Sequence, residues 1–323
     1  MQENTQFFDI LMDAIRRETE AFNYYYQASE MSPSVESRSL LIQLAEEERK
    51  HRTILMQEYQ NLKRLLSGET QQVSLEKEKV SFYLPEEPNF KRAQSIEPVD
   101  LAVVSLPTEF VGGDFFDTFT IKDDNKMGLL IFDVMGHGLA ATELKAKTKA
   151  SWGELKELDL EKKSPSLLLS PSSTITQLNR ILWDECQRLA SFVTMFYAVL
   201  DLSNNILIYA SAGHEPPILF GKEEYKQLIE ADLLLGFDKN KTYGEAAIEI
   251  HHGDVLVMFT DGVVESLNPK EEEFSRKNLT RVVEKNKNKT ASEIVLQILI
   301  ALKDFTRGEP LADEFTLAIA KMR

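Results

Sequence analysis

The chain of 323 residues has little cysteine, no long hydrophobic run and an excess of acid over base. Its single cysteine, Cys186, excludes an internal disulfide and zinc ligation by a cysteine cluster. No apolar run approaches the roughly 20 residues that cross a bilayer, and the polar N-terminus predicts no secretory signal. With 37 Lys and Arg against 52 Asp and Glu, the net charge is −15, which disfavours nucleic acid and anionic membranes as partners. These absences predict a soluble, cytoplasmic protein.

Residues 5–66 lack glycine and contain one proline, Pro33. Ser32 followed by Pro33 is typical of a helix N-cap and first helical position, so two helices are expected on either side of it. Steps of three and four mark one seam in each helix. The seam positions are Leu11, Ala14, Glu18, Ala21, Tyr25 and Ala28, then Leu41, Leu44, Glu48, His51, Leu55, Leu62 and Leu65. Residues 1–66 are therefore predicted to form a helical hairpin domain.

Residues 67–94 are charged and contain Pro85 and Pro88, as a linker would. From residue 95 onward, short β-branched runs predict a domain rich in strands, with helices between some of them. The expected strands are 99–106, 128–134, 192–200, 205–211, 217–220, 245–250, 255–260 and 315–321. The expected helices are 139–149, 173–189 and 291–305. The predicted fold class is α+β, an α-helical hairpin followed by an α/β sandwich of largely antiparallel sheets over 95–323.

Aspartates follow apolar runs or glycines at four places in the second domain. The four motifs are Gly112–Asp114, Asp133–Gly138, Asp261–Gly262 and Asp313–Thr316. Aspartates at strand ends can converge at one edge of a sheet, where they repel unless a cation joins them. An all-oxygen site of this kind suits Mg²⁺ or Mn²⁺. The alternative is that they are ordinary turn residues.

These motifs resemble those of the bacterial PPM-type serine/threonine phosphatases of the SpoIIE/RsbU group. The resemblance covers about residues 95–323, with six motifs in the family's order. They are Val111–Asp117 (VGGDFFD), Asp133–Gly138 (DVMGHG), Phe196–Asp201 (FYAVLD), Ala210–Pro217 (ASAGHEPP), Phe259–Glu265 (FTDGVVE) and Asp313–Leu317 (DEFTL).

The resemblance implies a centre with two Mn²⁺ or Mg²⁺ ions. By this analogy Asp133 bridges both ions, the Val134 carbonyl binds one, Asp261 and Asp313 complete the other, and Asp114 binds directly or through water. Two such ions acidify a water that attacks phosphorus and clamp the phosphoryl oxygens.

Three residues within or near the motifs are interpreted separately. Glu314 stands where the family often has a second aspartate, and we assign it no ligand role because its side chain reaches further. Glu215 stands where a small or apolar residue is expected, which raises a possible effect on substrate contacts. His137 is read as a turn-forming or hydrogen-bonding residue, with a general acid as the alternative.

Glu18, Glu48 and His51 place charge in the helical seams, which is costly unless the groups are paired or bound to metal. Glu48 and His51 are three residues apart and share a helix face. The surrounding segments, Ala14–Ala21 and Leu44–His51, resemble the rubrerythrin/ferritin-like family, in which Glu plus Glu-x-x-His is half of a di-iron site. The resemblance implies a homodimer with an iron site at its interface. The alternative is a dimeric hairpin with a solvated charged face.

Together the two resemblances imply a metal-dependent phosphoprotein phosphatase whose N-terminal domain senses a signal. In the SpoIIE/RsbU group the substrate is often a phosphorylated anti-sigma antagonist (STAS-type) protein. Two alternatives remain open. One is a ferritin-like di-iron oxidase or peroxidase with a regulatory C-terminal domain, and the other is a catalytically inactive module that binds a phosphoprotein.

Overall fold

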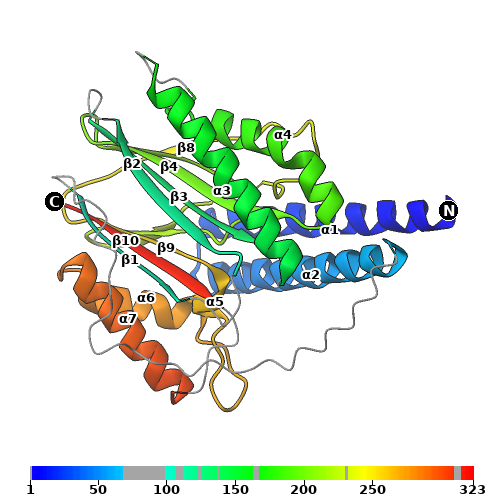
Figure 1. Cartoon of the computed structure of the whole chain (residues 1–323). Coiled ribbons are helices and arrows are strands. Elements are labelled where there is room, and N and C mark those ends of the chain that lie inside the picture. The colour runs from blue at the N-terminus through cyan, green and yellow to red at the C-terminus, as the bar shows by residue number, and fades with distance from the viewer. Residues whose placement is uncertain are drawn as a thin grey trace. The chain divides into compact units, whose positions relative to one another are not determined.

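The structure is a computed structural model in which the chain divides into two compact units (Figure 1). The two N-terminal helices form the first unit, and the strands with the remaining helices form the second. The described residues are 2–67, 99–106, 112–121, 125–136, 138–162, 167–229, 232–308 and 314–323. The predicted linker, 67–94, lies outside them except for Ser67. Within the described part no helix is long and apolar enough to span a membrane.

The first unit is the predicted helical hairpin, built from α1 (Gln2–Glu30) and α2 (Val35–Ser67). The prediction that Ser32 caps the second helix is wrong. The Ser34 hydroxyl instead accepts a 3.0 Å hydrogen bond from the Ser37 amide, as an N-cap does, because the helix begins at Val35. Between the helices, the Phe8 and Tyr59 rings meet edge to face at 5.3 Å.

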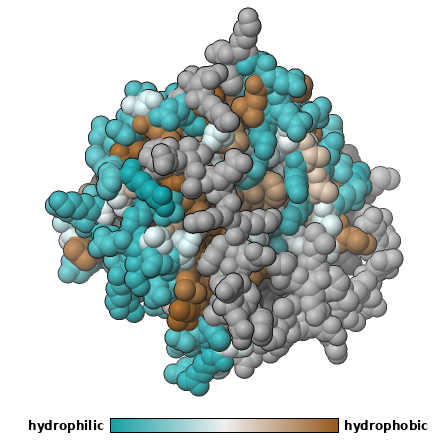
Figure 2. Space-filling view, turned by 60° about the vertical axis from the view of Figure 1, so that its left-hand side comes forward, coloured by the Kyte–Doolittle hydropathy of each residue, from teal (hydrophilic) through white to brown (hydrophobic). Residues whose placement is uncertain are grey.

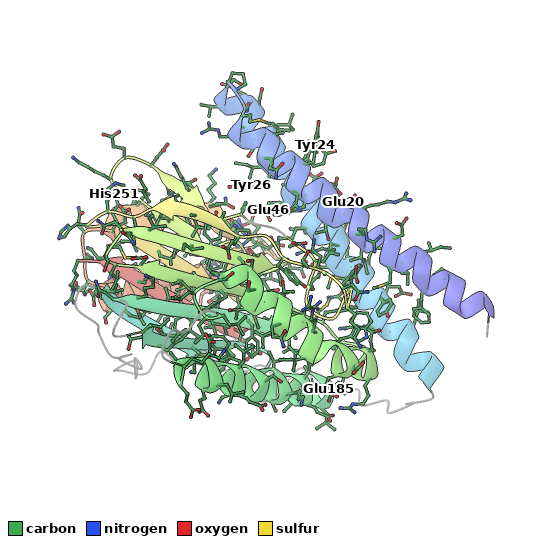
Figure 3. All side chains as sticks on the ribbon, turned by 90° about the horizontal axis from the view of Figure 1, so that it is seen from above. Glu20, Tyr24, Tyr26, Glu46, Glu185 and His251 are labelled. Atoms are coloured by element: carbon green, nitrogen blue, oxygen red, sulfur yellow. The ribbon has the colours of Figure 1, made fainter. Side chains whose placement is uncertain are left out.

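The stripe of α1 that is buried differs by about one position from the predicted seam. Leu11 is buried as expected, but the seam positions Ala14 and Tyr25 are only half-buried. Burial favours the neighbouring stripe with Phe22 and Tyr26, because these rings carry more apolar surface than alanine. Figure 3 shows Tyr24 and Tyr26 leaving α1 in different directions, and Tyr24 is exposed.

The second unit contains two five-stranded sheets in which every named pair of neighbouring strands is antiparallel. The first sheet has the order β1 (Val99–Leu106), β10 (Phe315–Met322), β9 (Val255–Phe259), β6 (Ile218–Phe220), β7 (Tyr225–Gln227). The second has the order β2 (Phe115–Ile121), β3 (Lys126–Val134), β4 (Val193–Asp201), β5 (Ile206–Ala212), β8 (Ala246–Glu249). The two sheets share an apolar core to which β3, β4, β9 and β10 all contribute.

Helices cover the outer face of each sheet, as Figure 1 shows. α3 (Leu139–Leu160) and α4 (Pro171–Leu189) pack on the β2–β8 sheet. α6 (Ser275–Asn286) and α7 (Ala291–Thr306) pack on the other sheet, and the short α5 (Asp261–Val264) follows β9. The layers therefore run helix, sheet, sheet, helix, which confirms the predicted sandwich.

On the face in Figure 2, apolar side chains occur in separate patches among hydrophilic ones.

Candidate metal centres

The β2–β8 sheet brings two of the predicted aspartates together. Asp114 directly precedes β2, and Asp133 is the penultimate residue of β3. In the β2–β3 register Phe115 pairs with Phe132, so Asp114 and Asp133 come next to each other at the same end of this sheet.

The β1–β7 sheet brings its own acidic residues to the corresponding end. Asp261 lies two residues after β9, and Glu314 directly precedes β10. The Thr260 amide donates to the Thr316 carbonyl at 3.0 Å, and the Thr316 amide donates to the Thr260 hydroxyl at 2.8 Å. These two hydrogen bonds hold the two strand ends together.

Carboxylate oxygens of Asp114, Asp133 and Glu314 lie within 4.8 Å of one another. Glu314 also accepts a 3.0 Å hydrogen bond from the Asp114 amide. Glu314 was predicted to have no ligand role because of its longer reach, but that reach is what brings its carboxylate to the Asp114 loop. The structure therefore places in the cluster a carboxylate that was not among the predicted ligands.

Asp114 is 4% exposed and experiences strong repulsion. Burial raises its pKa well above the usual range, and the charges of Glu314 and Asp261 add to this, while hydrogen bonds from Thr260 and Thr316 act in the opposite direction. A divalent cation would offset both the repulsion between the carboxylates and the cost of burying their charge. An all-carboxylate donor set of this kind fits Mg²⁺ or Mn²⁺.

The two glycines before Asp114 have a steric role. A Cβ on Gly113 would stand 2.5 Å from Asp133 Oδ1 and 2.6 Å from the Val134 carbonyl oxygen. A Cβ on Gly112 would overlap the Glu314 carboxylate. Only glycine lets this loop approach both the carboxylates and the Val134 carbonyl, which the resemblance names as a ligand.

The structure describes one of the remaining predicted residues of this centre, Asp261, and leaves two undescribed. Asp261 is half-buried and close enough for its charge to raise the pKa of Asp114. Asp313 and His137 lie outside the described residues. The ligand roles of Asp114, Asp133, Val134, Asp261 and Asp313 remain predictions.

The Thr260 hydroxyl, which was not among the predicted site residues, donates a 2.6 Å hydrogen bond to Asp114 Oδ2.

Glu215 was predicted to affect substrate contacts. The structure places Glu215 in an ion pair with Arg276, where only 7% of its side chain is exposed. The partner 61 residues away supplied no local signal in the sequence.

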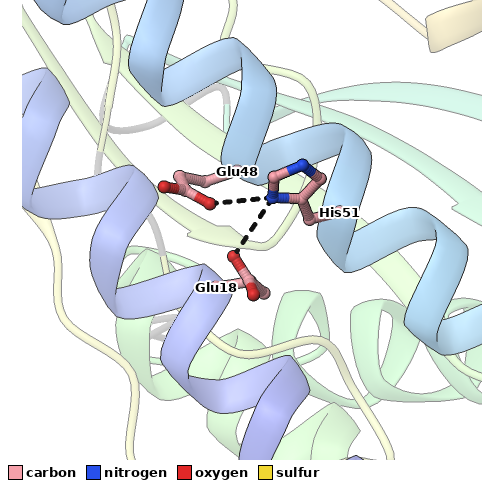
Figure 4. A group of neighbouring side chains, drawn as sticks. All are labelled: Glu18, Glu48 and His51. Atoms are coloured by element: carbon pink, nitrogen blue, oxygen red, sulfur yellow. Dashed lines mark hydrogen bonds and ion pairs between the residues drawn. The ribbon is translucent and has the colours of Figure 1, made fainter.

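The first unit contains a second cluster, drawn in Figure 4. Glu18 from α1 meets Glu48 and His51 from α2, and their ligand atoms lie within 4.8 Å of one another. His51 Nδ1 is 3.1 Å from Glu48 Oε2 and 3.7 Å from Glu18 Oε2. Burial and the Glu48 carboxyl raise the pKa of Glu18, whereas His51 lowers it. The structure thus brings the three predicted residues together, with the two glutamates half-buried and His51 exposed.

The paired antiparallel sheets between helical layers define the PP2C class of fold. The SiaA PP2C domain of Pseudomonas aeruginosa superposes with a TM-score of 0.60 at 16% identity, covering 69% of this chain and 86% of that one. RsbX in complex with magnesium superposes with a TM-score of 0.52 at 18% identity, covering 71% of this chain and 98% of that one.

Residues 123–323 match the family of Stage II sporulation protein E (SpoIIE), and the chain belongs to this family. Residues 9–97 match the Rubrerythrin family. The phosphoserine phosphatase RsbU of Bacillus subtilis is 29% identical over 233 residues, which are 70% of this chain. The chain spans 64% of the length of that relative.

Proposed function

We propose that the chain is a metal-dependent protein serine/threonine phosphatase. The observation that carries the proposal is the convergence of Asp114, Asp133 and Glu314, with Asp261 nearby, where the ends of both sheets meet. Membership of the SpoIIE family and similarity to a phosphoserine phosphatase support the same reaction class.

Divalent ions would be held within this site by Asp133, the Val134 carbonyl, Asp261 and Asp313. The carboxylates of Asp114 and Glu314 would complete the acidic lining of the site. When bound, such ions acidify water and neutralise charge on phosphoryl oxygens. The protein residues orient the donors. Thr260 fixes one oxygen of Asp114, the Asp114 amide fixes Glu314, and Gly113 leaves space between the loop and Asp133. No serine or cysteine nucleophile is required, and buried Cys186 is assigned to the core.

The experiment is release of inorganic phosphate by the full chain from a phosphoserine protein, with Mn²⁺ and again after chelation. A phosphorylated STAS-type anti-sigma antagonist is the substrate we favour, because the resemblance of the six motifs to the SpoIIE/RsbU group implies it. Release with Mn²⁺ that stops on chelation supports the proposal, and Cys186→Ala is expected to retain it. A phosphoprotein that binds tightly without phosphate release would favour the inactive binding module. If deletion of residues 1–66 then restores phosphate release, the full chain was inactive because the hairpin inhibits it.

We also propose that the hairpin is a metal-binding sensor and a homodimerisation domain of a cytoplasmic enzyme. The cluster of Glu18, Glu48 and His51 supports this, because one hairpin supplies only half of a four-helix di-iron site. Two copies would supply the three residues twice around iron. Occupancy would change dimer packing and shift α3, which follows the Asp133 motif, through the linker. Such coupling requires the metal to favour one of two states.

The sensor hypothesis is tested by phosphatase rates of the full chain with the hairpin site loaded and empty. Coupling is supported if the phosphatase rate of wild type changes when the hairpin site is loaded with metal and the rate of Glu48→Gln does not. Equal rates remove the coupling. Iron-dependent turnover of peroxide or oxygen would instead favour the oxidase alternative.

A further inference from the structure

A buried imidazole links the strands that carry the two halves of the candidate phosphatase site. His214 follows β5 and is 5% exposed. Its Nδ1 lies 2.9 Å from the Thr194 hydroxyl oxygen on β4. Thr194 pairs with Asp133 in the β3–β4 register, and its hydroxyl lies 3.4 Å from the Asp133 carbonyl. One side of the ring therefore reaches the strand that positions Asp133.

The other side of the ring faces the opposite sheet. Nε2 is enclosed and has no hydrogen-bond partner among the described residues. The backbone of Phe259 lies close enough to the ring to act on its pKa, which it raises. Phe259 ends β9 and directly precedes Thr260 and Asp261. His214 thus lies between Asp133 on one sheet and the Thr260–Asp261 turn on the other.

Glu215 and Arg276 hold this arrangement from the side. They form a buried ion pair, and Arg276 Nη1 donates to Gln227 Oε1 at 2.7 Å and to the Pro216 carbonyl at 3.3 Å. The Arg276 guanidinium carbon also lies 5.6 Å from the Phe259 ring centroid. The segment around His214 is therefore fixed to α6, and the residue before Thr260 is covered by the same arginine.

The protonation state of His214 suits a fixed spacer. Burial lowers the pKa of His214 to about 4, with Arg276 acting in the same direction and Glu215 and the Phe259 carbonyl opposing it. The ring is neutral at pH 7, so one nitrogen donates and the other accepts. The Thr194 hydroxyl donates its single proton to the Asp133 carbonyl, so the consistent assignment has Nδ1–H donating to the Thr194 hydroxyl oxygen.

We infer that His214 is a positioning residue for the metal centre. It sets the separation between Asp133 and the Thr260–Asp261 turn through its hydrogen bond with Thr194 and its position beside Phe259. The Glu215–Arg276 pair, which also covers the Phe259 ring, keeps it in place. This inference rests on the proposed metal-dependent function. It assigns His214 a role through other residues and no contact with substrate.

The test measures Mn²⁺ binding directly, by electron paramagnetic resonance of free Mn²⁺ titrated with the full-length protein. Asp133→Asn supplies the background from other sites. The variants are His214→Phe, which removes both ring nitrogens, and Thr194→Val, which removes the hydroxyl at similar volume. Their double variant completes a thermodynamic cycle. His214→Asn keeps a donor near the Nδ1 position, and His214→Gln keeps a polar group near the Nε2 position only.

We expect His214→Phe and Thr194→Val each to weaken Mn²⁺ binding about tenfold or more, as loss of a group that orients metal ligands does. The double variant should be no weaker than the worse single variant, and His214→Asn should recover most of the affinity lost in His214→Phe. Unfolding midpoints measured without metal report the structural role separately.

Three outcomes would overturn the inference. If His214→Phe lowers the unfolding midpoint but binds Mn²⁺ like wild type, His214 is a core residue only. Additive losses in the double variant would place His214 and Thr194 on independent paths. If wild type binds no more Mn²⁺ than Asp133→Asn, the proposed metal centre itself fails and the inference falls with it. If His214→Phe does not fold, the Mn²⁺ affinities and unfolding midpoints of Thr194→Val and His214→Asn provide the same test.

Discussion

The Thr260 hydroxyl donates a 2.6 Å hydrogen bond to Asp114 Oδ2, and this contact joins the two sheets at the candidate phosphatase site. Thr260 follows β9 in one sheet, and Asp114 precedes β2 in the other. The same hydroxyl accepts from the Thr316 amide, so its single proton is committed to the carboxylate. The position of Asp114 is therefore set by a residue that lies next to Asp261 in the chain.

Thr260→Val should weaken the site while keeping its shape. A hydrogen bond to a charged group contributes about 1.5–3 kcal/mol, so we expect a comparable loss of unfolding free energy and weaker Mn²⁺ binding. Tryptophan fluorescence during urea unfolding measures the unfolding free energy of the second unit, because Trp152 and Trp183 both lie in it.

The control for Thr260 is Thr280→Val, which removes a buried hydroxyl that donates to the Lys277 carbonyl within α6. It should leave Mn²⁺ binding unchanged, and Thr260→Ser should restore most of the affinity. Wild-type Mn²⁺ affinity in Thr260→Val would refute the role given to this hydrogen bond.

Glu314→Gln should raise the stability of the metal-free protein and reduce the extra stability that Mn²⁺ adds. Without metal the substitution removes one of the repelling charges beside Asp114 but keeps an acceptor for the Asp114 amide, so the unfolding midpoint should rise. With Mn²⁺ the gain in midpoint should be smaller than in wild type, because a donor has lost its charge.

Thermal unfolding with and without Mn²⁺ measures both effects of Glu314→Gln. The exposed Glu271→Gln, which removes the same charge away from the cluster, should match wild type in both conditions. An unchanged Mn²⁺ gain in Glu314→Gln would mean that Glu314 is no part of the metal site.

His214 should make the unfolding free energy of the second unit fall in mild acid. Its folded pKa of about 4 lies below the ordinary value of 6.5, so the unfolded state binds more protons between these values and stability falls as pH decreases through this window. At pH 5 the loss relative to pH 8 should be about 2 kcal/mol larger in wild type than in His214→Asn.

Urea unfolding followed by tryptophan fluorescence, in the presence of chelator, measures this difference. His252→Asn is the matched control, because His252 is exposed and should keep the wild-type pH dependence. Parallel pH curves for wild type and His214→Asn would contradict a buried, neutral ring.

The N-terminal cluster predicts a specific loss of iron. Glu48→Gln should reduce the iron affinity of the full chain by about tenfold or more, since it removes a charged donor that faces Glu18 and His51. Glu47→Gln changes the next, exposed glutamate and should bind iron like wild type. Iron titration with elemental analysis decides, and equal affinities would favour a solvated charged face.

Strands with continuous apolar runs were predictable, and Val99–Leu106 was predicted with its observed bounds. Phe115–Ile121 was missed because six of its seven residues are half-buried and polar residues interrupt the run. Ser275–Asn286 was missed because only two of its apolar residues, Leu279 and Val283, enter the core fully. Pattern reasoning works where burial is local and continuous, and both of these elements depend on tertiary contacts.

The same limit applies to the site. Aspartates at strand ends were visible because apolar runs lead into them. The role of Glu314 depends on the path of its side chain to the Asp114 amide, and that of His214 on contacts with Thr194 and Phe259. These contacts join residues far apart in the chain, so a single sequence carries no periodic signal for them.

The most direct test of the account is phosphate release by wild type and Asp133→Asn from a phosphoserine protein, with Mn²⁺ and after chelation. We predict release by wild type that requires Mn²⁺ and falls by at least about a hundredfold in Asp133→Asn, since the residue lies in the acidic cluster that would hold the ions. Equal release by the two proteins, or release by wild type that persists after chelation, would contradict the account.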